Sequence, residues 1–260
     1  MVQRDVLEYD LACETFRKII RGHPDDFVVA LSLAQTLIAW AYSSLRSGYM
    51  SKSVELATQG VVTALHLIDD NEELSEAWKI VGDGAYLASL VRVEGSIHLA
   101  NILSQRLLPA QGPRSLDGVT EEETLDKEEG GGSSSIRLLW YNHAAMETMV
   151  ILTRGDRLAH SGANFNLGLA KYQLSAATAG FVESSIRPVI ECFKKAIQSE
   201  PRNFEYWNAL GVATATHFPT IAEKAFSRAL WINERVRVFR ESGLIDIRVR
   251  PHGRIWGSCI

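Results

Sequence analysis

Histidine and cysteine, the side chains that most often act as catalytic bases, nucleophiles or metal ligands, are scattered along this sequence. His143, His160 and His217 stand far apart, and no two histidines share a helix face at the spacing of a metal site. We expect each of them at the surface or at its boundary, and a catalytic role is the alternative.

The three cysteines are also far apart, at Cys13, Cys192 and Cys259. Their odd number does not make a disulfide framework, and their spacing does not match a zinc site. This usage fits a reducing compartment.

Two glycine-rich stretches resemble a phosphate-binding loop only superficially. The run "GGGSSS" at 130–135 follows acidic residues and lacks the lysine and the preceding strand of such a loop, so it predicts a linker. The stretch "VGDGAY" at 81–86 lies inside a helical pattern, where its glycines indicate close packing. The sequence therefore predicts no catalytic residue, no metal site and no cofactor.

Two further motifs could be binding sites, but each also has an interpretation without a function. The tripeptide "RGD" at 154–156 suggests integrin binding, but the polar segment after Met1 is no secretory signal, so we interpret it as chance. The arginine-rich tail could contact RNA phosphates, and a disordered or artefactual tail is the interpretation that we prefer. Its arginines are Arg235, Arg237, Arg240, Arg248, Arg250 and Arg254.

Composition favours an ordinary folded protein. Of 260 residues, 46% are apolar, which is enough for a core, and the net charge of -4 gives no reason to expect nucleic-acid or membrane binding. We expect no apolar run long enough to span a bilayer. The prediction is a soluble intracellular protein without a membrane partner.

The elements that position these residues follow a helical repeat, clearest at "YWNALG". Trp207 and Leu210 are three residues apart and share a helix face, and Gly211 admits a neighbouring helix. The tetratricopeptide pattern places Trp-x-x-Leu-Gly on a first helix, then Ala, Phe and Ala on a second, then Pro. Further predicted packing positions of this C-terminal half are Leu167, Gly168, Phe193, Ala196, Pro201, Ala222, Phe226 and Ala229.

The N-terminal half repeats this logic. Residues typical of the second helix are followed by residues typical of the first helix of the next pair. This order occurs twice, and the second occurrence ends with "EAWKIVGDGAY". The predicted packing positions are Ala12, Phe16, Pro24, Ala30, Leu33, Ala57, Ala64, Trp78 and Gly82. Because stacked helix pairs bury the apolar faces that one pair leaves exposed, the predicted fold is all-α, a tetratricopeptide superhelix (alpha solenoid) of antiparallel helix pairs. Its repeat residues are packing positions rather than a reactive site.

The repeat pattern is interrupted and lacks capping helices. We predict helical repeats at 1–108 and 136–232, a disordered acidic and Gly/Ser-rich loop at 109–135, and an irregular basic tail at 233–260. Solenoids normally end in polar caps. We therefore expect a fragment of a longer protein, with a tail that is artefactual.

Several stretches together resemble a particular family. The long helices between residues 27 and 68, "EAWKIVGDG", a variable insertion and "YWNALGV" follow one another as in the large tetratricopeptide scaffold of the Ski (superkiller) complex, over residues 10–232. The resemblance implies a non-catalytic cytoplasmic scaffold that joins a DEVH-box RNA helicase to WD-repeat proteins. That assembly supports 3′-to-5′ messenger RNA decay by the exosome, so RNA contact would be indirect.

Two other functions stay open. The first is a generic tetratricopeptide adaptor that binds peptides or chaperone C-termini. It would need a basic, Asn-rich groove, and Asn166, Lys171 and Asn208 supply it only in part. The second is the regulatory arm of an enzyme, which would need a catalytic domain after Leu230.

Overall fold

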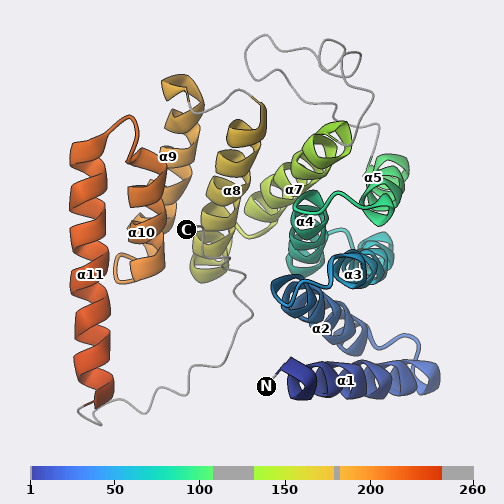
Figure 1. The fold of residues 1–260 in the computed structure, drawn as a ribbon. Helices are drawn as coiled ribbons and strands as arrows, with labels where there is room; N and C mark the ends of the chain where they lie inside the picture. Colours follow the sequence, from blue (N-terminus) through green and yellow to red (C-terminus); the bar gives the residue numbers. More distant parts are fainter. Residues whose placement is uncertain (1, 108–131, 179–181, 242–260) are drawn as a thin grey trace. The chain divides into compact units, whose positions relative to one another are not determined.

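In the computed structural model, residues 2–107, 132–178 and 182–241 are described, and within them every regular element is a helix (Figure 1). The predicted all-α solenoid class is confirmed, because helices pack against neighbouring helices. The chain divides into two compact units, which we call unit 1 (Met1–Leu152) and unit 2 (Thr153–Ile260).

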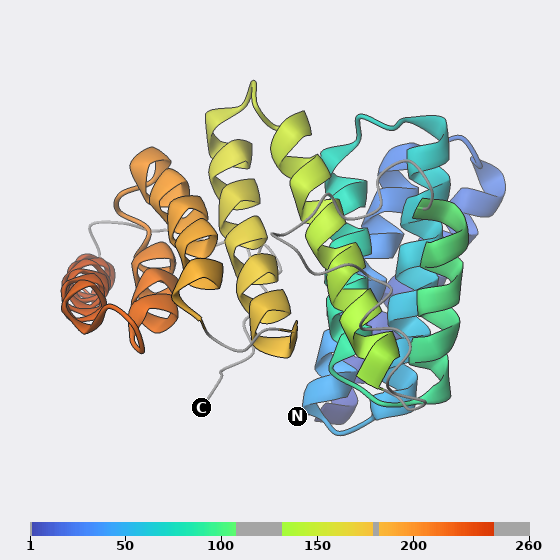
Figure 2. The same cartoon turned by 90° about the horizontal axis from the view of Figure 1, so that it is seen from above.

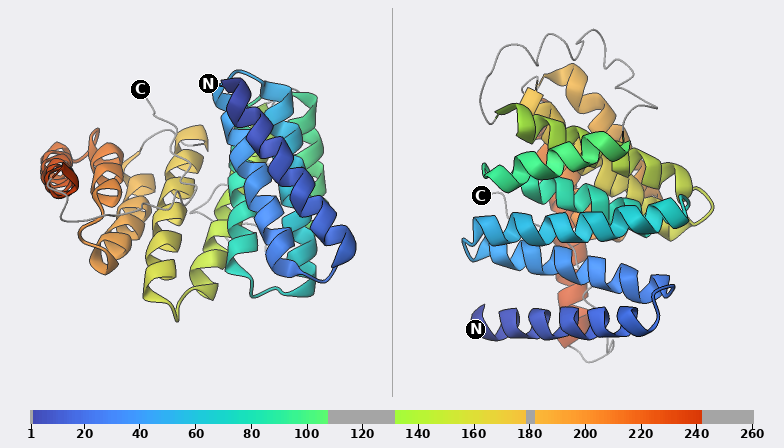
Figure 3. Two further views of the ribbon diagram at one scale, coloured as in Figure 1. Left: turned by 90° about the horizontal axis from the view of Figure 1, so that it is seen from below. Right: turned by 90° about the vertical axis from the view of Figure 1, so that its right-hand side faces the viewer.

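Unit 1 is a stack of helices. α1 packs on α2, α2 on α3 and α3 on α4, so each helix covers the face that its predecessor exposes (Figure 3). The described helices of this unit are α1 (Val2–Gly22), α2 (Phe27–Arg46), α3 (Met50–Asp70), α4 (Ser75–Ser89), α5 (Glu94–Leu107) and α7 (Gly132–Leu152).

The pairing of α4 is the main irregularity of unit 1. α4 packs most extensively against α7, and its contact with α5, the next helix along the chain, is much smaller. α5 lies against α3, α4 and α7. A tetratricopeptide-like pair therefore consists of α4 and α7, with α5 and residues 108–131 inserted between its two helices.

Unit 2 contains two pairs joined through their middle helices. α8 packs on α9, α9 on α10 and α10 on α11 (Figure 2). The helices are α8 (Arg157–Thr178), α9 (Glu183–Ser199), α10 (Phe204–Thr214) and α11 (Pro219–Glu241).

Local sequence determines where several helices begin and end. The Asp26 carboxylate accepts from the amides of Val28 and Val29, and so it caps α2. After α2, Gly48 adopts a φ of 84°, a left-handed conformation that suits glycine and lets the chain turn into α3. Asn203 caps α10 by accepting from the amide of Glu205.

The core of unit 2 is aromatic and aliphatic. Phe165 of α8 lies with its ring centroid 4.6 Å from that of Tyr206 on α10 and 5.8 Å from that of Phe193 on α9. Offset or tilted aromatic pairs at such distances add to the stability gained from burial alone. Three helices are therefore joined through one side chain.

The expectation that no apolar run could span a bilayer is wrong for α2. This helix is long and apolar enough by length and composition to cross a membrane. Its apolar side chains are explained by its place in the stack, where Leu37, Ile38 and Ala41 are buried and α1, α3 and α4 all contact it. A helix surrounded by neighbours is apolar on most of its circumference.

The helix boundaries differ from the predicted domain boundaries in two places. α7 begins at Gly132, inside the predicted loop, and α11 continues to Glu241, beyond the predicted end at residue 232. Residues 233–241 contain no Gly or Pro to stop a helix, and a first helical turn tolerates small polar residues because its amides lack intrahelical acceptors. The rest of the predicted loop and tail, 109–131 and 242–260, lies outside the described residues.

Candidate interaction surfaces

The clearest contacts of the predicted packing residues join a glycine to a phenylalanine in unit 2. A Cβ atom built on Gly168 of α8 would lie 2.6 Å from Cε1 of Phe193 on α9. A Cβ on Gly211 of α10 would lie 2.6 Å from Cε1 of Phe226 on α11. In both pairs the ring of the second helix fills the space that the missing side chain leaves on the first.

Unit 1 has the same kind of contact with different side chains. A Cβ on Gly82 of α4 would overlap Cε of Met146 and lie 3.1 Å from Oδ1 of Asn142, both on α7. These α7 residues were not predicted from the sequence, because neither is an Ala or Phe of the repeat pattern and an insertion separates them from α4. Similarly, a Cβ built on Gly60 of α3 would lie 3.1 Å from Cδ1 of Ile38 on α2.

The other predicted packing residues vary in burial. Leu33, Ala57, Ala64, Leu167, Ala196, Leu210, Ala222 and Ala229 are buried. Ala12, Phe16, Ala30, Trp78, Trp207 and Phe226 are half-buried, and Pro24 and Pro201 are exposed. The two prolines lie in the turns after α1 and α9, so they mark helix ends.

The candidate chemical residues lie apart. His143 is buried, contrary to the surface position expected for it, and its Nε2 lies 3.4 Å from Oε1 of Glu147 on the same helix. His160 Nδ1 lies 3.4 Å from Oγ1 of Thr153. Within the described ranges, no three His, Cys, Asp or Glu side chains gather as a metal site would require.

The "RGD" tripeptide has a structural role. Oδ1 of Asp156 accepts from the amides of Leu158 at 2.9 Å and Ala159 at 3.2 Å. This is the geometry of a helix N-cap, and α8 begins at the next residue, Arg157.

The residues considered for a carboxylate clamp do not form one on α8. Asn166 and Lys171 are five residues apart on this helix, which places them well apart around its axis. Asn208 lies on α10 and is exposed. A clamp needs donors that converge on one point, so Asn166 and Lys171 do not form one together.

One ion pair on α4 is largely shielded from solvent. Lys79 Nζ lies 2.6 Å from Oδ2 of Asp83, and the two side chains are 29% and 19% exposed. The Asp83 carboxylate raises the pKa of Lys79 above the usual 10.5, although burial acts in the opposite sense. Lys79 is therefore charged at neutral pH and tied to its own helix.

The outer face of α11 combines cations with an aromatic ring. Trp231 is 43% exposed, and the guanidinium carbons of Arg228 and Arg235 each lie 4.3 Å from its ring centroid. Cation–π contacts hold both arginines along the helix.

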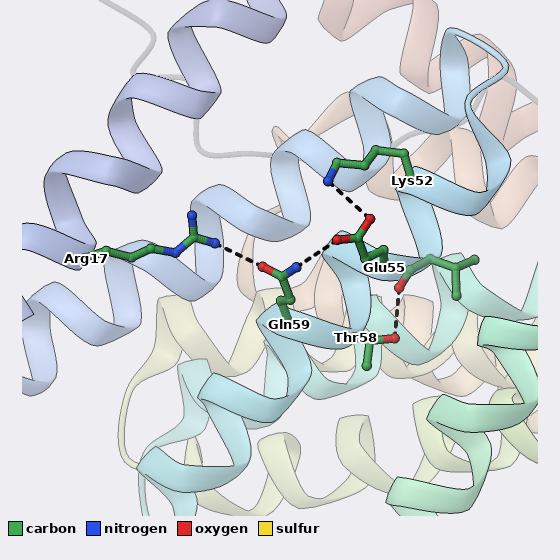
Figure 4. A network of polar contacts seen from close by, with 6 residues as sticks. Arg17, Lys52, Glu55, Thr58 and Gln59 are labelled. Atoms are coloured by element: carbon green, nitrogen blue, oxygen red, sulfur yellow. Dashed lines mark hydrogen bonds and ion pairs between the residues drawn. The ribbon is translucent and has the colours of Figure 1, made fainter.

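A groove of about 350 Å³ lies on unit 1, where α1, α2, α3 and α5 meet. Its floor is apolar and includes Leu33 and Leu37, which are 7% and 1% exposed. Its polar residues include Arg17 of α1 and Gln59 of α3, and Arg17 Nη2 donates to Oε1 of Gln59 at 3.0 Å (Figure 4). This groove was not predicted from the sequence, because its walls come from helices that are distant in the chain.

Comparisons with known proteins find one distant sequence relative and two solved structures of low similarity. No family model matches the chain. The chain is 21% identical over 215 residues to Superkiller protein 3 of Schizosaccharomyces pombe (strain 972 / ATCC 24843), a match that covers 81% of this chain. It spans 15% of the length of that curated relative.

Two solved structures are similar to the chain at a low level. MamA is 15% identical with a TM-score of 0.42, and the match covers 91% of this chain and 95% of that one. BtubC (BKLC) from P. vanneervenii is 13% identical with a TM-score of 0.33, and the match covers 100% of this chain and 98% of that one. Because both TM-scores are low, neither adds to what the helices themselves show.

The predicted resemblance to a tetratricopeptide scaffold of the superkiller type is confirmed. The chain is built from tetratricopeptide-like helix pairs, and its sequence resembles a part of Superkiller protein 3.

Proposed function

We propose that this chain is a non-catalytic protein-interaction scaffold and that it forms a segment of the large scaffold of a Ski complex. The observation that carries the proposal is the similarity over 215 residues to Superkiller protein 3, in a chain whose helices form solenoid-type pairs. Solenoids present extended surfaces to other proteins.

The finer part of the proposal concerns partners. By the resemblance, the partners are a DEVH-box RNA helicase and WD-repeat proteins, and the assembly supports exosome-mediated 3′-to-5′ messenger RNA decay. The proposed location is the cytoplasm, with the nucleus as the alternative. RNA would be bound by the partners rather than by this chain.

An affinity purification tests this function. The full chain, carrying an epitope tag, is expressed in eukaryotic cells and purified, and bound proteins are identified by mass spectrometry. The expected result is co-purification of the helicase and WD-repeat proteins, followed by co-elution of the purified components in size-exclusion chromatography.

A matched variant shows whether the helix pairs are needed. Gly211→Leu places a branched side chain where Phe226 packs, and so it disrupts the α10–α11 pair. Gly211→Leu should reduce recovery of the partners. Gly162→Ala should not, because a Cβ added at Gly162 would meet no neighbouring heavy atom within 4 Å. Recovery of chaperones alone would favour the peptide adaptor, and recovery of neither group would refute the scaffold.

A further inference from the structure

The groove formed by α1, α2, α3 and α5 is an unusual feature of this repeat protein. α1, α2 and α3 belong to the stack, but α5 lies in the insertion that separates α4 from α7. His98 and Ile102 of α5 line the groove together with Arg17 of α1. The inserted helix thus contributes lining residues to a groove whose other residues come from the stack.

The floor of this groove can accept an apolar side chain. Leu33 and Leu37 of α2 are joined there by Val62 of α3 and Ile102 of α5, which are half-buried. A volume of about 350 Å³ is at the lower end of the range of ligand-binding pockets. It suits one or two side chains of a bound peptide rather than a whole helix.

Two threonines that line the groove need no hydrogen-bond acceptor from a ligand. Thr58 Oγ1 donates to the carbonyl oxygen of Val54 at 2.8 Å, and Thr63 Oγ1 donates to that of Gln59 at 2.9 Å. Their hydroxyl groups already have acceptors within α3. An apolar ligand group can therefore lie beside them without stranding a donor.

Arg17 gives the groove an electrostatic preference. Among the described residues, its guanidinium group bonds to the neutral amide of Gln59, and no carboxylate lies within ion-pair distance of it. Gln59 Nε2 in turn donates to Glu55 at 3.2 Å, and Glu55 is neutralised by Lys52 at 3.1 Å (Figure 4). Within the described ranges, the charge of Arg17 thus has no counterion, and a ligand carboxylate could accept from the N–H donors that Gln59 does not use.

We propose that this groove binds a peptide segment of a partner protein in which an Asp or Glu stands next to an aliphatic residue. The carboxylate accepts from the guanidinium of Arg17, and the aliphatic side chain lies on the floor between Leu37 and Ile102. Charge complementarity decides the occupant, because arginine matches a carboxylate in a bidentate geometry. The proposal rests on the protein-binding part of the proposed function, but not on the identity of the Ski-complex partners.

Selection from a peptide library tests the site. Phage that display short random peptides are panned against the full chain and, in parallel, against Arg17→Gln and Lys18→Gln. Lys18 neighbours Arg17 on α1, is exposed and does not line the groove, so its variant controls for the loss of one charge. We expect peptides with Asp or Glu beside Leu, Ile or Val on the native chain and on Lys18→Gln, and their loss on Arg17→Gln.

A synthetic peptide of the selected sequence then gives affinities by fluorescence anisotropy. Arg17→Gln should weaken binding by about tenfold or more, as expected for a hydrogen bond to a charged group. Circular dichroism checks that each variant folds. Arg17→Glu should regain binding when the acidic residue of the peptide is changed to lysine, and this exchange excludes a purely structural role of Arg17.

Several results would overturn the proposal. They are the absence of enriched peptides, enrichment without acidic residues, equal affinity for Arg17→Gln, or displacement of the peptide by a short single-stranded RNA. Recovery of the helicase and WD-repeat proteins by Arg17→Gln would leave the scaffold function intact. The peptide experiments and the affinity purification therefore distinguish a wrong proposal for the groove from a wrong proposal for the scaffold function.

Discussion

Trp78 and Trp207 make the same hydrogen bond in different units. Trp78 Nε1 donates at 3.0 Å to the carbonyl oxygen of Glu72, six residues earlier in the chain. Trp207 Nε1 donates at 2.9 Å to the carbonyl oxygen of Pro201, also six residues earlier. Each indole thus ties the start of one helix to the turn before it, in addition to its packing within the repeat.

Removing the indole donor should have a small, equal cost in both units. Trp78→Phe and Trp207→Phe keep an aromatic ring, and water can reach both exposed carbonyl groups, so each should lose about 0.5–1.5 kcal/mol of unfolding free energy. Urea unfolding followed by circular dichroism measures it. If Trp207→Leu costs no more than Trp207→Phe, ring packing contributes little.

Two glycines of α8 should respond in opposite directions to the same substitution. Gly162→Ala meets no atom within 4 Å and should stabilise the chain by about 0.5–1 kcal/mol, because alanine has the higher helix propensity. Gly168→Ala pushes into Phe193, which is 1% exposed, and should destabilise it by about 1–3 kcal/mol. Thermal and urea unfolding compare the two, and a stabilising Gly168→Ala would contradict the packing role proposed for this glycine.

Two glycines of α4 should differ because their neighbours differ in stiffness. A Cβ on Gly84 would overlap Cγ2 of Val61, a β-branched side chain that is fully buried. A Cβ on Gly82 would overlap the terminal methyl group of Met146, which can rotate away. Gly84→Ala should therefore lower the unfolding midpoint in urea more than Gly82→Ala, and the reverse order would contradict this account.

Removing the lysine of the α4 ion pair should lower the unfolding free energy more than removing the aspartate. Lys79→Met leaves the Asp83 carboxylate shielded and unpaired, and it should cost about 1–3 kcal/mol of unfolding free energy. Asp83→Asn should cost less, because the long stem of Lys79 can carry its ammonium group to water. Equal losses would show that the pair acts only through its packing.

The same pair predicts a pH dependence at alkaline pH. Since the pKa of Lys79 is raised in the folded chain above the usual 10.5, the stabilisation is complete below pH 10.5 and is lost as the pH rises through the folded value. The difference in stability between the native chain and Lys79→Met should shrink over that range. Urea unfolding at a series of alkaline pH values measures it, and a difference that stays constant would refute the electrostatic contribution.

Much of the fold was predictable because apolar spacing shows which faces of the helices are buried. Spacing of three residues between Trp207 and Leu210, followed by Gly211, indicates a face that another helix approaches, and Phe226 lies there. Spacing does not show which helix provides the partner. The pairing of α4 with α7 was therefore missed, as was α5, whose sequence lacks the repeat residues.

The interaction surfaces were predictable only in part. Asn166, Lys171 and Asn208 were considered because of their chemistry, but their positions around their helices decide whether they converge. The groove beside Arg17 depends on four helices, and Ile102 is far from Leu33 in the chain. Such a site comes from tertiary packing, for which no local pattern exists.

The separation of α4 from α7 also matters while the protein is being made. Residues 90–131 stand between the two helices, a connection roughly tenfold longer in residues than that between α10 and α11. At the usual rate of translation, α7 leaves the ribosome about 3–13 s after α4. During that interval the face of α4 that carries Gly82 has no partner, so the nascent chain is open to chaperones or to misassembly at this point.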